Sequence, residues 1–280
     1  MPISMDPRQA EEDLREKVSF LHSGIPDCSW PIVTHAEEQP EFAGIHGTGF
    51  FARKERALFF ITARHCLSKS ADGAIAAIAN RLHIPYSLNV RNASPSDYVQ
   101  FESICSYRHH SPEIPGVFMD VVVLQPNVRP GSWQERHLRS RAAKIPPTGE
   151  WLDKVAHAVT SEGGIVSGGN IPMVAVGYPV DGTSTEVVQA PYEIVTQRVI
   201  ISGLLSKGTY PHTMSIVDLT WEHGLSGFSG SPVFARFKDK DGPQYALAGM
   251  LVVGGSRKGE FIRISHIAEA VFEMTRLQCQ

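Results

Sequence analysis

Residues 47–66 read GTGFFARKERALFFITARHC and contain two apolar runs separated by a charged turn. The runs Gly47–Phe51 and Ala57–Ala63 are rich in aromatic and β-branched residues, with Arg53–Arg56 between them. Two such runs around a short polar turn predict a β-hairpin. His65 follows directly, so a histidine lies where the second strand gives way to a turn.

Further runs of the same kind predict that most of the chain is β. Trp30–Val33 is expected to be an extended segment that enters the core. Strands are predicted at 99–106, 120–124, 173–176, 194–204, 214–221, 231–235, 245–253 and 261–264. Strands and helices do not alternate regularly, which disfavours a doubly wound parallel sheet.

Helices are expected at both ends of the chain. Pro7–Leu21 has apolar residues at helical spacing, and Ser265 could cap a final helix with Ile267, Val271 and Met274 on one face. The expected organisation is an N-terminal appendage at 1–40, a first β half at 41–125, a linker with an insertion at 126–170, and a second β half with the final helix at 171–280.

The linker carries basic residues among proline and glycine, and a weak amphipathic helix is predicted to begin at Trp151–Val155. We interpret the basic residues as a solvated face and not as a binding patch. They are Arg129, Arg136, Arg139, Arg141 and Lys144.

The composition, with 42% hydrophobic and 20% charged residues, is ordinary for a soluble globular protein. A chain of 280 residues can bury a core as one large domain or two small ones. The net charge of −3 lacks the overall positive charge that is typical of proteins that bind nucleic acid or an anionic membrane. No apolar run approaches the ~20 residues of a membrane span, and Met1–Val18 has no secretory h-region, so we expect a cytoplasmic protein.

The four cysteines, Cys28, Cys66, Cys105 and Cys279, are scattered and show no C-x-x-C spacing. This pattern favours reduced thiols over a zinc site or a disulfide scaffold. The histidines at 109–110 lie beside Ser-Pro and are typical of a loop. We therefore expect no metal and no cofactor.

The stretch Gly227–Val233, GFSGSPV, is the strongest candidate for chemistry. By itself such a cluster is usually a turn. A serine hydroxyl becomes a nucleophile, however, when a base takes its proton and nearby amides hold the oxyanion. His65 ends one predicted strand and Asp120 opens another, so His65, Asp120 and Ser229 together predict acyl-transfer chemistry.

In this order and spacing, the sequence resembles the trypsin-like (chymotrypsin-fold) serine peptidases, and most of all the bacterial group that includes the Deg/HtrA and glutamyl endopeptidase types. The resemblance covers roughly residues 44–272. It rests on Gly47–Phe50, Thr62–Cys66, Asp120–Leu124, Val176–Pro179, Gly227–Pro232 and Ala248–Gly254. It implies a mainly β fold of two six-stranded antiparallel β-barrels with a short N-terminal and a C-terminal helix.

The resemblance also implies a serine endopeptidase that acts on a protein or peptide substrate. Ser229 would attack the scissile carbonyl, His65 would carry the proton, and Asp120 would orient the imidazole. The amides of Gly227 and Ser229 would form the oxyanion hole. Ser226 and Ser231 do not match the position of the nucleophile in the family motif and are expected to stabilise the turn.

Two residues depart from the pattern of the family. Phe228 stands where zymogen-activated relatives carry an aspartate that binds a new N-terminal ammonium, so activation by that salt bridge is excluded in this frame. Cys66 stands where relatives often have a half-cystine, but no cysteine lies between residues 41 and 60 to pair with it. Cys66 is therefore expected to be a free, buried thiol.

The resemblance places His223 at the base of the primary specificity pocket, with Gly254 and Gly259 along its walls. A histidine there could suit a polar or acidic side chain, but Leu251 stands where glutamyl-specific relatives place a histidine. Small or medium apolar side chains remain as an alternative. The backbone of Val252 and Gly254 would pair with an extended peptide.

Two other functions are considered. An α/β-hydrolase triad of Ser229, Asp241 and His266 fails, because Ser231 stands where the nucleophile elbow needs glycine and the strand–helix alternation is missing. A peptide-binding or scaffold module that keeps the fold without turnover stays open. We expect no nucleic acid or membrane partner and no PDZ-type extension after the final helix, and the oligomeric state is left open.

Overall fold

The structure is a computed structural model. It describes residues 20–35, 43–67, 82, 84–87, 95–108, 118–147, 150–153, 171–180, 185–189, 192–239, 242–255 and 257–278. The helix expected at Pro7–Leu21 lies almost entirely outside these residues.

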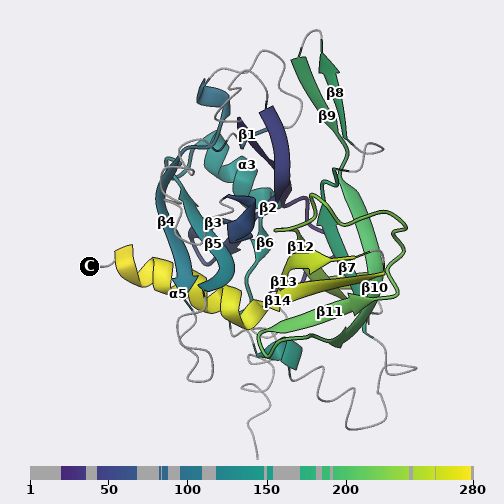
Figure 1. Cartoon of the computed structure of the whole chain (residues 1–280). Helices are drawn as coiled ribbons and strands as arrows, with labels where there is room; N and C mark the ends of the chain where they lie inside the picture. Colours follow the sequence, from purple (N-terminus) through teal and green to yellow (C-terminus); the bar gives the residue numbers. More distant parts are fainter. Residues whose placement is uncertain are drawn as a thin grey trace, which may run out of the picture.

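The first half of the chain forms a six-stranded sheet (Figure 1). Its strands follow the order β1-β2-β3-β5-β4, and β6 pairs with β2. They are β1 (Ser29–His35), β2 (Ala43–Lys54), β3 (Ala57–Thr62), β4 (Phe101–Arg108), β5 (Phe118–Pro126) and β6 (Ala143–Lys144). Neighbours along the main path are antiparallel, and Lys54 pairs with Ala57 across the turn between β2 and β3. The hairpin predicted from residues 47–63 is confirmed.

The second half forms a closed barrel in the order β10-β11-β14-β13-β12-β7. Its strands are β7 (Pro172–Gly177), β10 (Val199–Lys207), β11 (Thr213–Val217), β12 (Pro232–Asp239), β13 (Gly242–Gly254) and β14 (Lys258–Arg263). A two-stranded ribbon, β8 (Thr185–Gln189) with β9 (Tyr192–Thr196), extends from it (Figure 1). The fold is therefore mainly β, with one closed six-stranded barrel and a second sheet.

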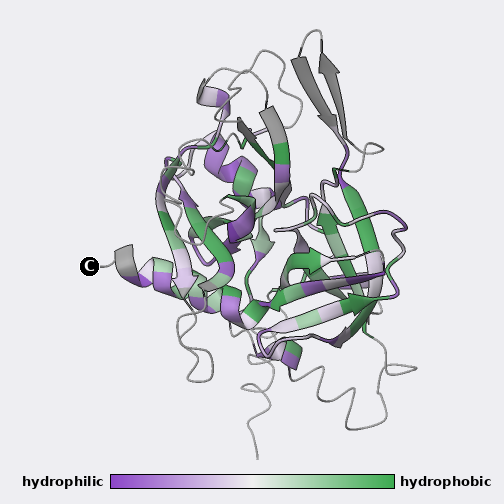
Figure 2. Cartoon of the chain, in the orientation of Figure 1, coloured by the Kyte–Doolittle hydropathy of each residue, from purple (hydrophilic) through white to green (hydrophobic). Residues whose placement is uncertain are grey.

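The core is built from buried apolar residues of both sheets, which form continuous runs along β3, β7 and β13. Figure 2 shows the hydrophobic segments of the strands. In the first half, Phe51 packs edge-on against Trp30, with ring centroids 5.1 Å apart, and also against Phe60 at 5.0 Å. All three rings are at most 1% exposed. Trp30 lies in β1, so the expectation that this segment enters the core is confirmed.

Several strand boundaries differ from the sequence-based prediction. The single strand expected at 194–204 is two strands, β9 and β10, broken at Gln197 and Arg198. The strand expected at 214–221 ends at Val217, before Asp218 with a φ of +53°. β6, β8 and β9 were not separately predicted, because short strands carry too few residues for a clear period of two.

Helix α5 (Ile264–Gln278) packs against β4 and β5 of the first sheet and against β13 and β14 of the barrel (Figure 1). The Tyr107 hydroxyl donates to Glu269 Oε2 at 2.6 Å, which ties the helix to β4. The final helix is confirmed, but it begins at Ile264. Ser265 therefore lies inside the first turn and is not the residue before the helix, as its predicted role as a cap required. None of the described helices is both long enough and apolar enough to span a membrane.

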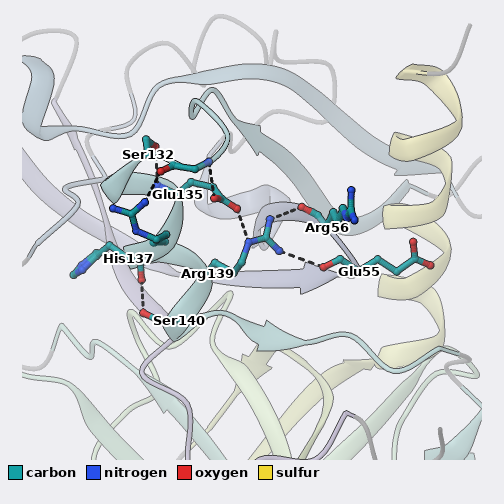
Figure 3. A network of polar contacts seen from close by, with 9 residues as sticks. Glu55, Arg56, Ser132, Glu135, His137, Arg139 and Ser140 are labelled. Atoms are coloured by element: carbon teal, nitrogen blue, oxygen red, sulfur yellow. Dashed lines mark hydrogen bonds and ion pairs between the residues drawn. The ribbon is translucent and has the colours of Figure 1, made fainter.

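Helix α3 (Trp133–Arg141) lies in the linker and holds the turn between β2 and β3 (Figure 3). Ser132 caps it by accepting from the Glu135 N–H at 3.2 Å. The Arg139 guanidinium binds the Glu135 carboxylate at 2.5 Å and donates to the carbonyls of Glu55 and Arg56. A basic side chain in the linker thus stabilises a turn of the first sheet.

The interpretation of the basic linker as a solvated face is accordingly wrong for Arg139, Arg141 and Lys144. Arg141 pairs with Asp27 at 3.3 Å and lies over the ring of Trp30. The Lys144 ammonium donates to the Leu21 carbonyl at 3.0 Å. These side chains fasten neighbouring segments of the chain.

His22 links the two halves. Its backbone forms a bridge with Tyr245 of β13, with N–H to carbonyl distances of 2.9 and 2.8 Å. Its ring atom Nε2 accepts the backbone N–H of Lys144 in β6 at 3.0 Å. A neutral imidazole is required for this bond, because a protonated ring has no acceptor.

Candidate active site

His65 and Asp120 are brought together by adjacent antiparallel strands. His65 lies in a short 3-10 turn, η1 (Arg64–Cys66), directly after β3, and Asp120 lies in β5, which pairs with β3. The carboxylate accepts the backbone N–H of His65 at 2.9 Å through Oδ1, and Oδ2 lies 2.5 Å from His65 Nδ1. The two bonds fix both the position and the orientation of the imidazole, and leave Nε2 as its proton-accepting atom.

The electrostatic surroundings of His65 favour its protonated form. The hydrogen bond to Asp120 is the main cause and the contact with Cys66 adds to it, so the pKa of His65 is raised above its ordinary 6.5 although partial burial opposes the shift. An imidazolium formed at this position is therefore stabilised by the carboxylate.

The turn that carries Ser229 is attached to the first sheet beside His65. The carbonyl of Ser229 accepts the Thr48 N–H at 2.8 Å and the Cys66 thiol at 3.4 Å. Cys66 is the residue after His65, so this contact brings the serine next to the histidine although 163 positions separate Cys66 from Ser229. The structure thus joins His65 to Asp120 and holds the backbone of Ser229 against Cys66, the residue after His65.

The Ser229 hydroxyl donates to the carbonyl of Val252 at 3.2 Å. Val252 lies at a β-bulge, because the register between β13 and β14 shifts between Leu251 and Val253. A bulge releases one residue from the ladder. The Val252 carbonyl is thereby free to accept the hydroxyl of the candidate nucleophile.

Every carbonyl of the turn from Ser226 to Ser229 has a donor. Besides the two donors to Ser229, they are the Val180 N–H to Ser226 at 2.9 Å, the Thr48 hydroxyl to Gly227 at 2.8 Å, and the Ser231 N–H to Phe228 at 2.9 Å. The turn is therefore held by hydrogen bonds to its own residues and to other segments of the chain.

Two N–H groups of the same turn stay open. The Phe228 N–H donates to the Leu225 carbonyl at 3.1 Å, and the Gly230 N–H donates to the Leu251 carbonyl at 2.7 Å. Across the described part of the chain, no acceptor takes the N–H of Gly227 or of Ser229. Each shares a planar trans peptide with a bonded carbonyl, so its direction is fixed. Two fixed, open donors beside a serine hydroxyl have the character of an oxyanion site.

Glycine is the residue type that fits at position 227. Its φ is +87°, which L-residues rarely adopt. A Cβ atom added there would overlap the Tyr178 carbonyl oxygen and lie 2.8 Å from the Val180 nitrogen. The segment after β7 therefore leaves no room for a side chain at position 227.

Thr48 organises the junction and was not singled out from the sequence. Its hydroxyl donates to Gly227 and accepts the Tyr178 N–H at 3.0 Å, and its carbonyl accepts the Thr62 hydroxyl at 2.9 Å. Thr48 and Tyr178 are both fully buried. The only signal in the sequence was the glycine on either side of Thr48, in Gly47-Thr48-Gly49.

Phe228 and Cys66, the two residues that depart from the family pattern, are both buried. Phe228 is fully buried and meets the ring of Trp221 edge-on at 5.9 Å. Cys66 is a free thiol and 5% exposed, which confirms the expectation of a free, buried thiol. Cys28 and Cys105 are also free thiols.

The residues expected to bind substrate fall into two places. Gly254 pairs with Gly259 across β13 and β14, two residues beyond Val252. His223 lies on an exposed turn with its ring 5.1 Å from that of Trp221. The side chains in contact with the two glycine positions are Leu225 and Leu251.

Within the described ranges, no group of three or more histidine, cysteine, aspartate or glutamate side chains is arranged to hold a metal ion. Neither the protein-family models nor the curated proteins that were compared with the chain match it.

Proposed function

We propose that this protein is a trypsin-like serine endopeptidase that hydrolyses peptide bonds through an acyl-enzyme intermediate. The observation that carries the proposal is the placement of the His65–Asp120 pair beside a turn that holds Ser229 with two open N–H donors. Base, orienting carboxylate, nucleophile and oxyanion donors are the complete set that acyl transfer requires.

In the proposed first step, Ser229 Oγ attacks the scissile carbonyl carbon while His65 Nε2 takes the hydroxyl proton. The carbonyl π electrons move to oxygen, and the N–H groups of Gly227 and Ser229 hold the resulting oxyanion. Asp120 stabilises the imidazolium, which then gives its proton to the leaving amine as the C–N bond breaks. Water, activated by the same histidine, hydrolyses the ester and restores the serine.

An extended peptide would find a free strand edge beside Ser229. β12 pairs with β13 only as far as Met250, and contacts of the nucleophile turn continue this edge to Leu251. From Val252 to Gly254, the edge of β13 facing the turn has no neighbouring strand among the described elements. A substrate strand added there would pair its backbone N–H and carbonyl groups with those of Val252 to Gly254, whatever the substrate side chains are.

The proposal includes a finer view of the fold. In it, the first sheet is the counterpart of the closed barrel, and the two form the pair of six-stranded barrels of chymotrypsin type. The catalytic residues would then lie at the junction, where Thr48 and Cys66 contact the turn of Ser229.

A second candidate function is a latent or inactive peptide-binding module of the same fold. The observation in its favour is the hydrogen bond from Ser229 Oγ to Val252, because a hydroxyl engaged there is not donating to His65. Rotation about the Cα–Cβ bond of Ser229 would release it. The two functions differ in whether the hydroxyl reacts.

A fluorophosphonate probe separates them, because it labels only an activated serine. The wild type should be labelled, Ser229→Ala should not, and Ser231→Ala should be labelled like the wild type. Ser231 is a matched control, since it is buried in the same turn and its hydroxyl lacks a partner within the described structure. Labelling of Ser229→Ala refutes the assignment, and a folded wild type that is not labelled favours the binding module.

A further inference from the structure

Leu225 occupies the space that two glycines leave open beside the nucleophile. Gly254 and Gly259 face each other across β13 and β14. A Cβ atom added to Gly254 would overlap Leu225 Cδ1, and one added to Gly259 would lie 3.4 Å from the same methyl carbon. Leu225 is 6% exposed. One side chain of the chain itself therefore fills the depression between the two glycines.

This depression lies directly beside the reacting serine. Val252, whose carbonyl accepts the Ser229 hydroxyl, precedes Gly254 by two residues, a separation of about 7 Å along a strand. On the other side, the Leu225 carbonyl accepts the Phe228 N–H, so Leu225 begins the turn that ends at Ser229. When the scissile carbonyl of a substrate lies at Ser229, the substrate side chain next to that carbonyl would thus enter the space that Leu225 occupies.

The side chains that face this space are hydrocarbon, and the Lys258 carbonyl oxygen lies 3.1 Å from the added Cβ position of Gly254. Leu251 Cδ1 lies 2.8 Å from the added Cβ position of Gly259, and Leu225 covers the rest. His223 meets the ring of Trp221 edge-on and is exposed. The Glu260 carboxylate binds Thr209 and Lys258. Selection here is therefore by size, because the side-chain atoms nearest the two glycine positions are hydrocarbon carbons of Leu225 and Leu251.

We propose that Leu225 determines specificity by occupying the pocket for the substrate side chain on the acyl side of the cleaved bond. Glycine and alanine fit there, and larger side chains must displace a buried leucine. This inference rests on the proposed function. It assigns the substrate class as peptides with a small residue before the cleaved bond.

The first test is a cleavage profile on a peptide library with the full-length protein and with Leu225→Ala and Leu225→Val. The wild type should cleave after glycine and alanine. In Leu225→Ala, kcat/KM for leucine or phenylalanine relative to alanine should rise roughly 10–200-fold, with Leu225→Val between the two. All three proteins should still be labelled by the fluorophosphonate at Ser229, which shows that each variant is folded and keeps a reactive serine.

The second test measures the contact without activity. Gly254→Ala should lower the unfolding temperature of the wild type, because its methyl overlaps Leu225, and should lower it less in Leu225→Ala. Equal losses in the two backgrounds place Leu225 elsewhere and overturn the inference.

The outcomes separate the two proposals. Labelled proteins whose preference is the same with and without the leucine overturn the role of Leu225 and leave the peptidase standing. A folded wild type without labelling overturns the peptidase, and the specificity inference falls with it. If Leu225→Ala does not fold, Leu225→Val, which removes one methylene, must still shift the preference toward larger residues.

Discussion

Thr48→Val removes one hydroxyl and keeps the shape of the side chain, so it tests how the turn of Ser229 is held. The hydroxyl makes two hydrogen bonds, to the Gly227 carbonyl and from the Tyr178 N–H, and both Thr48 and Tyr178 are fully buried. A net ~1 kcal/mol is lost per bond, and more where a buried N–H is left without an acceptor. We expect the free energy of unfolding to fall by about 2–4 kcal/mol.

The same change should lower activity. Without the Thr48 hydroxyl, the peptide group between Gly227 and Phe228 loses its anchor, and the turn that presents the N–H groups of Gly227 and Ser229 can shift away from the oxyanion. Loss of one such donor costs ~10²–10³ in rate, so we expect kcat/KM to fall between roughly 10- and 1000-fold. Fluorophosphonate labelling rates give the same readout when no substrate is known. Urea unfolding at neutral pH gives the stability.

Thr213→Val is the matched control. Thr213 is 3% exposed, and its hydroxyl also accepts a backbone N–H, from Tyr210 at 3.1 Å, and donates to a carbonyl. It lies in β11, which pairs with β10 and β14. We expect a similar loss of stability with labelling unchanged. The proposed anchoring is refuted if the labelling rate of Thr48→Val, divided by the fraction of folded protein, is within two-fold of the wild-type rate.

Three further changes test other parts of the structure. Asp120→Asn removes the main cause of the raised pKa of His65, so the pH at which labelling reaches half its maximum, above the ordinary 6.5 in the wild type, should move down while the maximal rate falls. Gly227→Ala forces a Cβ against the Tyr178 carbonyl at a φ of +87°, and should cost about 1–3 kcal/mol of stability and abolish labelling. Burial lowers the pKa of His22 to about 4, so the free energy of unfolding should fall as pH falls from 6.5 to 4. His22→Gln should remove that pH dependence in urea unfolding.

The signs of the two histidine effects are opposite. The raised pKa of His65 means that its contribution to stability is full below pH 6.5 and is lost as pH rises through the raised value, whereas the base form needed for catalysis appears only over that rise. The lowered pKa of His22 makes the unfolded chain bind more protons between pH 4 and 6.5. An Asp120→Asn profile that matches the wild type, a labelled Gly227→Ala, or an unfolding free energy that is flat from pH 6.5 to 4 in the wild type contradicts the respective prediction.

The sequence by itself predicted most of the strands and the residues of the candidate site. Apolar runs with turn residues between them are local signals, so the hairpin ending at His65, the strand with Asp120 and the glycine turn around Ser229 could be recognised one by one. The order of these residues then suggested a triad.

Only the tertiary structure decided how these parts meet. The hydroxyl of Thr48, the bulge at Val252 and the methyl group of Leu225 act across segments far apart in the chain, and no local pattern records a contact between distant segments. For the same reason, the basic side chains of the linker looked solvated in the sequence but bind turns and strands in the fold. Side-chain type sets what a residue can do, and long-range packing selects its partner.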